Sequence, residues 1–136
     1  MIVIDAQHMI LGRLATFAAK QALLGQEVRV INAERAVISG KKANTINMMT
    51  VRNERGIPAK GPFMPKMADR YVRRTIRGML PYKIPKGAQA YKRVLCYVGV
   101  PDEFKDVKVT QPEQASVSKL PTMNLITVGE ALKRFR

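Results

Sequence analysis

The first thirty-one residues constrain the fold most, because they follow a strand–helix–strand pattern. Residues 2–4 are apolar and β-branched, which is typical of a buried strand. Apolar residues then recur near helical spacing from Leu11 until Gly25, which is placed to end a helix. Residues 27–31 alternate in polarity and predict a second strand. This order implies a right-handed parallel crossover, so we predict an α/β domain with a parallel sheet.

The next part of the chain predicts a helix followed by a loop. The short apolar run at residues 36–38 is interpreted as a turn or a helix entry rather than a full strand. Ser39 is a candidate cap for a helix that runs toward Asn53. Residues 54–65 contain three Pro and two Gly, and this composition predicts an extended loop laid onto a surface.

Residues 67–79 form the clearest helical pattern, with mostly apolar side chains, Thr75 among them, at i, i+1, i+4, i+5, i+8, i+9 and i+12. Pro81 lies just beyond it and favours a break. After a basic turn, residues 88–93 predict a short helix and residues 94–98 a third buried strand.

The C-terminal part is nearly neutral, and residues 102–124 predict irregular structure. Thr127 and Glu130 have capping-box spacing, which predicts a terminal helix over residues 131–135. No internal repeat or linker composition divides the chain, so residues 1–136 are predicted to form a single domain with a basic insertion.

Positive charge is concentrated in one block of the sequence. The 136 residues carry 24 Lys or Arg against 10 Asp or Glu, a net charge of +14, and 46% hydrophobic residues are enough for a folded core. Residues 41–93 hold fourteen of the bases and two of the acids, a net charge of +12. A compact chain with this charge repels itself unless a counter-charge is present, so we predict a polyanionic partner. The residues predicted to bind this polyanion are Lys41, Lys42, Arg52, Arg55, Lys60, Lys66, Arg70, Arg73, Arg74, Arg77, Lys83, Lys86, Lys92 and Arg93.

Four of these arginines share one face of the predicted helix 67–79. They are spaced i, i+3, i+4 and i+7 from Arg70 to Arg77, with only Asp69 nearby to neutralise them. The planar guanidinium group binds phosphate oxygens bidentately, and phosphates would remove the repulsion between these side chains. The aromatic RNP motif is absent from the sequence, so the predicted contact is by shape and phosphate rather than by base reading.

Catalytic and cofactor motifs are not found in the sequence. The first turn, residues 5–12, has a single glycine and lacks the Gly-x-Gly-x-x-Gly pattern, and residues 40–42 lack the spacing of a Walker loop. One histidine, His8, and one cysteine, Cys96, cannot make a zinc cluster or an internal disulfide. Without an apolar run of about 20 residues, we expect no membrane partner. We therefore predict a non-enzyme without metal, cofactor or small-molecule substrate, and keep a nucleotide-using α/β enzyme as the less favoured alternative.

Several short motifs resemble the large-subunit ribosomal protein L-thirteen family. The N-terminal block and the Arg-Gly-Met-Leu-Pro run starting at Arg77 form a specific combination, and the Gly-Pro loop is similar to the archaeal and eukaryotic branch. The matching segments are residues 3–6, 11–15, 30–34, 38–40, 60–62, 74–83 and 99–101.

The resemblance implies a three-layer α/β/α fold with a short four-stranded parallel sheet and a basic loop–helix insertion. It also implies a structural constituent of the large ribosomal subunit in the cytoplasm, bound to large-subunit ribosomal RNA and neighbouring ribosomal proteins and acting early in subunit assembly. Residues 102–124 match weakly, which leaves a contact with a neighbouring protein open for them. An RNA-binding translational regulator acting off the ribosome is the alternative function.

Overall fold

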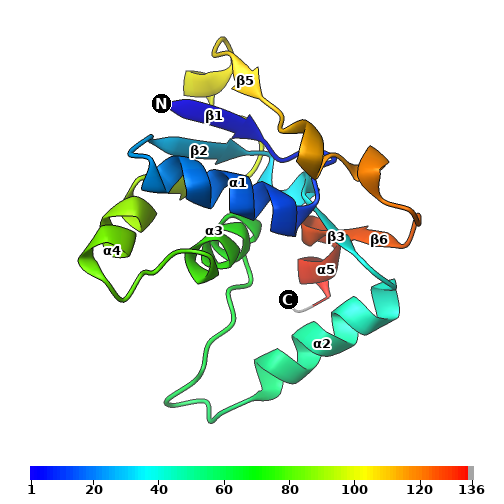
Figure 1. The fold of residues 1–136 in the computed structure, drawn as a ribbon. Helices are drawn as coiled ribbons and strands as arrows, with labels where there is room; N and C mark the ends of the chain where they lie inside the picture. The colour runs from blue at the N-terminus through cyan, green and yellow to red at the C-terminus, as the bar shows by residue number, and fades with distance from the viewer. Residues whose placement is uncertain (135–136) are drawn as a thin grey trace.

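A parallel four-stranded sheet forms the centre of the computed structural model, which describes residues 1–134 (Figure 1). Its strands are β1 (Ile2–Asp5), β2 (Val28–Ile31), β4 (Val94–Cys96) and β5 (Val109–Thr110), in the order β4-β2-β1-β5. Each neighbouring pair is parallel, and the register places Ile2 opposite Val28 and Val28 opposite Val94. The predicted α/β class and the four-stranded parallel sheet are confirmed.

The crossover between the first two strands is α1 (Leu11–Leu23), as predicted from the apolar spacing. Gly25 follows the helix with a φ of +93°, a left-handed conformation that glycine adopts without steric cost. Small side chains let the helix approach the sheet closely. Its buried residues are Leu11, Leu14, Ala15, Ala18, Ala19 and Ala22.

The two faces of the sheet are covered unequally. Helix α1 contacts both α3 (Ala68–Gly78) and α4 (Pro85–Lys92). The three helices cover one face, because the connections from β1 to β2 and on to β4 step in the same direction across the sheet (Figure 1). On the other face, Val3 and Ile31 pack against Phe104, which lies in the 3-10 turn η2 (Asp102–Phe104). The architecture therefore has three layers, with the second helical layer reduced to a single turn.

A second, two-stranded sheet corrects the prediction for residues 36–39. The strand β3 (Val37–Ser39) pairs antiparallel with β6 (Leu125–Thr127). Residues 36–38 are therefore not a helix entry, and Ser39 does not cap the following helix. The helix α2 (Lys42–Glu54) begins after Lys41 without a side-chain cap. The prediction was wrong because the partner strand lies almost ninety residues away and leaves no mark on the local pattern.

The remaining elements differ from the predictions mainly in length. Helix α4 begins at Pro85 rather than at residue 88, since proline is well suited to the first turn. Strand β4 ends at Cys96, and Val98 is exposed. The segment 102–124, predicted to be irregular, contributes β5 and the 3-10 turns η3 (Glu113–Ala115) and η4 (Val117–Lys119).

The C-terminal helix α5 (Val128–Lys133) confirms the predicted cap. The Thr127 hydroxyl accepts a hydrogen bond from the Glu130 backbone N–H at 3.2 Å. The helix begins at Val128 rather than at residue 131 and ends at Lys133, with Arg134 as its C-cap; Phe135, the last residue of the predicted range, lies outside the described residues. Within residues 1–134, no helix has the length and apolar character needed to cross a membrane.

Candidate nucleic-acid interface

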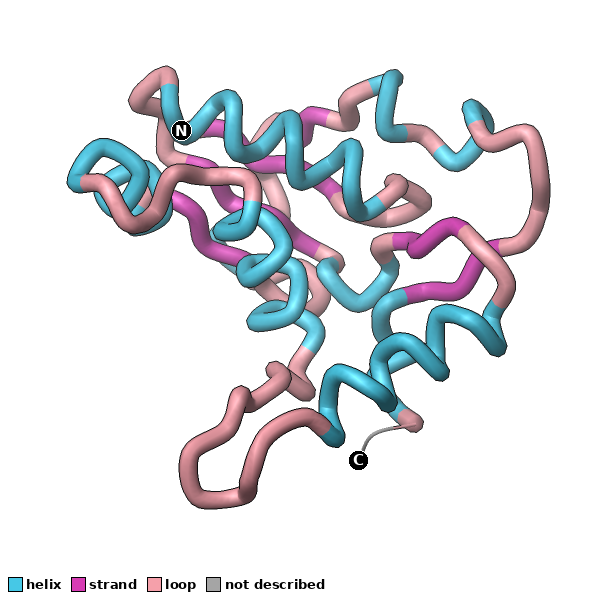
Figure 2. Tube along the Cα trace, turned by 60° about the horizontal axis from the view of Figure 1, so that its bottom comes forward, coloured by secondary structure: helices cyan, strands magenta, loops and turns pink. Residues whose placement is uncertain are grey.

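Helix α2 and the loop 55–67 form an arm that projects from the body of the protein, as Figures 1 and 2 show. In α2 only Thr45 and Met49 are buried, and every residue from 51 to 60 is exposed. Met49 is fully buried in the main core and anchors the middle of the helix. The arm therefore offers most of its surface to a partner rather than to the fold.

Two glycines give the loop its shape. Gly56 and Gly61 both have positive φ angles, +86° and +75°. A Cβ atom on Gly56 would lie 2.1 Å from the Gly61 carbonyl oxygen, so the two sides of the loop touch at this point. The Gly61 N–H donates to the Ile57 carbonyl at 2.8 Å. Lys60 lies in the turn of this closed loop, where its N–H donates to the Ile57 carbonyl at 3.2 Å, and Phe63 follows just after the loop closes.

The arginines of α3 do not all point to solvent, although the sequence pattern suggested a single outward face. The Arg73 Nε donates to the Val94 carbonyl at 2.9 Å, and its guanidinium carbon lies 4.4 Å from the centre of the Tyr91 ring. The Arg77 guanidinium lies 4.8 Å from the Tyr82 ring centre. Arg73 and Arg77 are half-buried, so part of this face holds the protein together.

The other predicted bases remain available to a partner. All of the fourteen except Arg73, Arg77 and Arg93 are exposed, and the Arg93 guanidinium donates to the Ala22 carbonyl at 3.2 Å. Of the fourteen, within the described part of the chain, only Lys42 pairs with a carboxylate, that of Glu130 at 3.3 Å. The block therefore keeps nearly all of its charge unneutralised.

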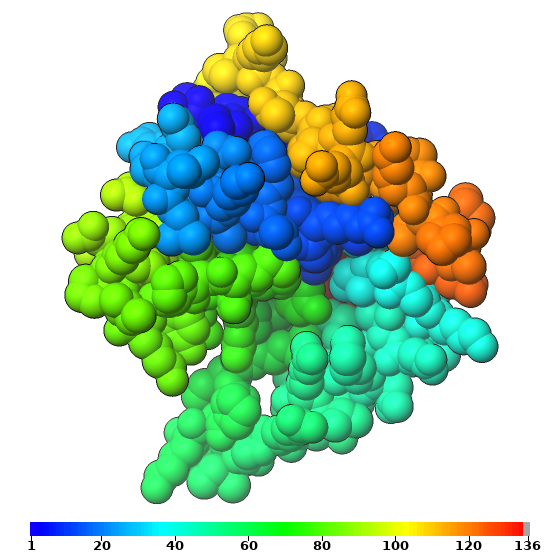
Figure 3. Space-filling model, in the orientation of Figure 1, coloured from blue at the N-terminus to red at the C-terminus, as the bar shows by residue number. Residues whose placement is uncertain are grey.

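A hollow of about 460 Å³ lies between the arm and α3. Figure 3 shows the surface hollowed where the arm leaves the body. The hollow brings together Arg52 and Arg55 from the end of α2 with Arg74 from α3. Tyr71 forms part of the wall, and its pKa is raised by burial, an effect that the nearby Arg52 charge opposes. Basic residues that are distant in the sequence therefore line one concave surface.

Two bases outside the block extend this basic surface along α1. Lys20 lines a second hollow, of about 530 Å³, together with Lys86 from α4. Arg13 lies further along α1 and is also exposed. Neither residue is among the fourteen predicted from the sequence, because both lie outside the segment 41–93 in which the charge is concentrated. The available signal was that α1 carries two bases and no acid.

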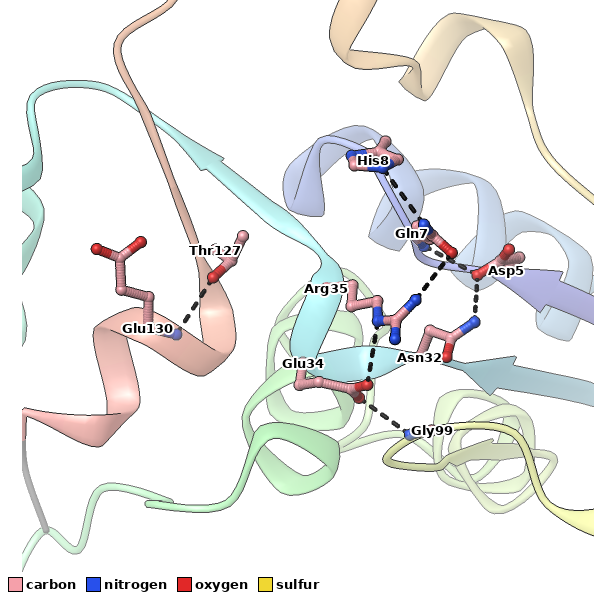
Figure 4. A network of polar contacts seen from close by, with 9 residues as sticks. All are labelled: Asp5, Gln7, His8, Asn32, Glu34, Arg35, Gly99, Thr127 and Glu130. Carbon is pink, nitrogen blue, oxygen red and sulfur yellow. Dashed lines mark hydrogen bonds and ion pairs between the residues drawn. The ribbon is translucent and has the colours of Figure 1, made fainter.

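The carboxyl ends of β1 and β2, where α/β enzymes bind nucleotides, hold a polar network instead (Figure 4). The Asp5 carboxylate accepts hydrogen bonds from the Asn32 side chain at 2.9 Å, the Gln7 backbone N–H at 2.9 Å and the Gln111 side chain at 3.1 Å. His8 lies beside it at an exposed turn. The Asp5 carboxylate repels phosphate, and the same network contains the Arg35 guanidinium, which donates to the Gln7 side chain at 3.3 Å.

The chemistry of Cys96 also lacks the features of a nucleophile. Desolvation by burial raises the pKa of its thiol to about 12, while the Arg73 charge lowers it by less. A thiol with this pKa is not ionised at neutral pH. Within residues 1–134, no group of three or more His, Cys, Asp or Glu is placed to hold a metal ion.

These features are typical of a class of α/β proteins that bind polyanions through an exposed cationic arm. The family comparison is more specific. Residues 1–103 match the model of the family Ribosomal protein L13. The chain therefore belongs to the ribosomal protein L13 family, whose members are structural ribosomal proteins rather than enzymes.

Relatives of similar length agree with this assignment. The chain is 46% identical over 135 residues to the large ribosomal subunit protein uL13 of Methanosarcina barkeri, covering 98% of this chain and 96% of the relative. It is 42% identical over 134 residues to the protein of that name from Methanococcoides burtonii, with 98% and 96% covered. The protein of that name from Methanocaldococcus jannaschii is 44% identical over 138 residues, again with 98% and 96% covered. These relatives are archaeal, in agreement with the predicted branch.

Proposed function

We propose that this protein is a structural constituent of the large ribosomal subunit in the cytoplasm, and that it binds large-subunit ribosomal RNA during early assembly. Residues 1–136 act as one domain in this proposal. The exposed bases of residues 41–93 contact RNA phosphates, and neighbouring ribosomal proteins contact the remaining surface. The family membership and the names of the archaeal relatives support the ribosomal part of the proposal.

The RNA-binding part of the proposal rests on the unpaired positive charge of the arm and α3. Eleven Lys and Arg residues of the block are exposed, and among the described residues only one of them, Lys42, forms an ion pair. At physiological ionic strength the Debye length is about 8 Å, so neighbouring cations on this surface reinforce one another's attraction for phosphate. The concave surface between the arm and α3 can hold a stretch of RNA backbone against several Lys and Arg side chains at once.

Co-sedimentation with large subunits in a sucrose gradient tests the ribosomal role. We expect the full-length protein to migrate with the large subunit and to be released at high salt. A protein found only in the soluble fractions, yet bound to messenger RNA, would instead support the regulator acting off the ribosome.

A salt titration tests the phosphate contacts directly. If about six phosphates are neutralised, the slope of log K against log salt is about −4 to −5. Changing Lys60 and Lys66 together to Gln should make the slope shallower by about 1.5. The matched control changes Lys108 and Lys119 to Gln, which removes the same charge from exposed positions outside the block and should leave the slope unchanged. A flat titration, or an equal effect of the two pairs, would contradict the proposal.

A further inference from the structure

One aromatic ring is exposed at the edge of the hollow between the arm and α3. Phe63 is 68% exposed, an unusual state for a phenylalanine, and it lines this hollow. Its backbone is held by the Arg74 guanidinium, which donates to the Phe63 carbonyl at 2.7 Å. The ring lies against Gly61, where a Cβ atom would be only 2.9 Å from it, so a residue without a side chain is needed there. The ring is therefore presented to solvent by a braced backbone.

The rest of the hollow combines positive charge with flat or apolar surface. Arg52, Arg55 and Arg74 supply three exposed guanidinium groups, and no acidic residue is found among the described residues that line the hollow. Tyr71 and the prolines of the loop supply the apolar wall. The volume of about 460 Å³ is within the range of sites for small ligands.

We propose that this hollow receives one unpaired nucleotide of the bound RNA, with its base stacked on Phe63 and its phosphates held by Arg52, Arg55 and Arg74. This inference rests on the proposed function and adds base stacking to the phosphate contacts described there. An unpaired nucleotide of the RNA offers both the free aromatic face of its base and the negative charge of its phosphate. A paired strand presents its phosphates to the arginines but keeps its bases stacked in the duplex. An apolar peptide would leave three cations without a partner.

The test uses RNA hairpins that differ at one position. The first hairpin carries a single bulged 2-aminopurine, the second an abasic bulge and the third no bulge. We expect the full-length protein to bind the first at least about five-fold more tightly than the second, because one stacked base contributes at this level. We also expect 2-aminopurine fluorescence to fall on binding. Phe63→Ala should abolish the preference and the quenching, while Phe63→Tyr should retain both.

The control variant is Ile57→Ala, which removes an apolar side chain that is 56% exposed on the same loop but does not line this hollow. It should behave as the unaltered protein does. Equal affinity for the bulged and abasic hairpins would overturn the inference and leave the proposed function standing. If Phe63→Ala leaves every RNA affinity unchanged but prevents entry into large subunits, a neighbouring protein fills the hollow and the inference is wrong. Failure to bind any hairpin would count against the proposed function itself.

Discussion

Replacing Arg73 should destabilise the fold, whereas replacing its neighbour Arg70 should not. Both are arginines of α3, but Arg70 is exposed and Arg73 is half-buried against β4. Strand β4 is at the edge of the sheet, and the Arg93 carbonyl already accepts from Val28 on the inner side. Successive carbonyls alternate along a strand, so the Val94 carbonyl points away from the sheet and receives the Arg73 Nε–H instead.

The magnitude follows from the two contacts that Arg73 makes. A hydrogen bond from a charged donor contributes about 1.5 to 3 kcal/mol, and partial exposure favours the lower end of that range. Stacking of the guanidinium on Tyr91 adds about 0.5 to 1 kcal/mol. We therefore expect Arg73→Gln to lower the free energy of unfolding by about 2 to 3 kcal/mol. For 136 residues this corresponds to a fall in Tm of about 7 to 10 °C.

The assay is urea unfolding of the full-length protein followed by far-ultraviolet circular dichroism, with a check that the m value is unchanged. Arg73→Lys keeps the charge but loses the planar group, so we expect it to cost about half as much as Arg73→Gln. Arg70→Gln should change stability by less than about 0.5 kcal/mol. The reasoning is refuted if Arg73→Gln is no more destabilising than Arg70→Gln. It is also refuted if Arg73→Lys is as stable as the unaltered protein, because charge alone would then explain the effect.

Three other predictions concern the body of the protein. Gly87→Ala should lower the free energy of unfolding, measured in urea, by at least about 2 kcal/mol, because the new Cβ would lie 2.0 Å from the Pro81 carbonyl oxygen. The control is Gly78→Ala, which should leave stability unchanged, because a Cβ at Gly78 would have no atom within 4 Å. Thr127→Val should lower stability by about 1 kcal/mol by removing the cap of α5, and an unchanged Tm would contradict this. Because burial raises the pKa of Cys96 to about 12, the folded state loses stability as pH rises from the unfolded pKa of about 8.5 toward 12. Near pH 8.5 its alkylation by iodoacetamide should be at least about 100-fold slower in the native state than in urea, and similar rates would count against the raised pKa.

Local patterns were sufficient to predict the elements whose determinants are close in sequence. The β1–α1–β2 unit follows from apolar periodicity and a helix-ending glycine. The cap of α5 follows from a spacing of three residues between Thr127 and Glu130. In each case the interactions that decide the structure lie within about one turn of helix or one strand, so the sequence pattern records them.

The short strands could not be predicted in this way. Strand β5 has two residues and pairs with β1 at the start of the chain, and the partners Ile38 and Ile126 of β3 and β6 are 88 residues apart. A strand of two or three residues has too little alternation to give a period, and its stability comes from a distant partner. The sequence pattern also could not show which arginines are half-buried, since nothing in the spacing of α3 distinguishes Arg73 from Arg70.

The basic residues fall into a half-buried group and an exposed group, and this explains how the folded chain tolerates its net positive charge. Arg73, Arg77 and Arg93 lie half-buried against aromatic rings or carbonyl oxygens of the body, where neutral partners accept their N–H groups or stack on their planes. The exposed bases instead lie on the arm and the outer surfaces of α3 and α4, where water screens their mutual repulsion. Arg74 joins the two groups, because one of its N–H groups holds the loop at Phe63 while the rest of the guanidinium remains exposed. Neutralising the arginines of α3 as a set would therefore disturb the body and the surface together, and only single exposed positions such as Arg70 separate the two effects.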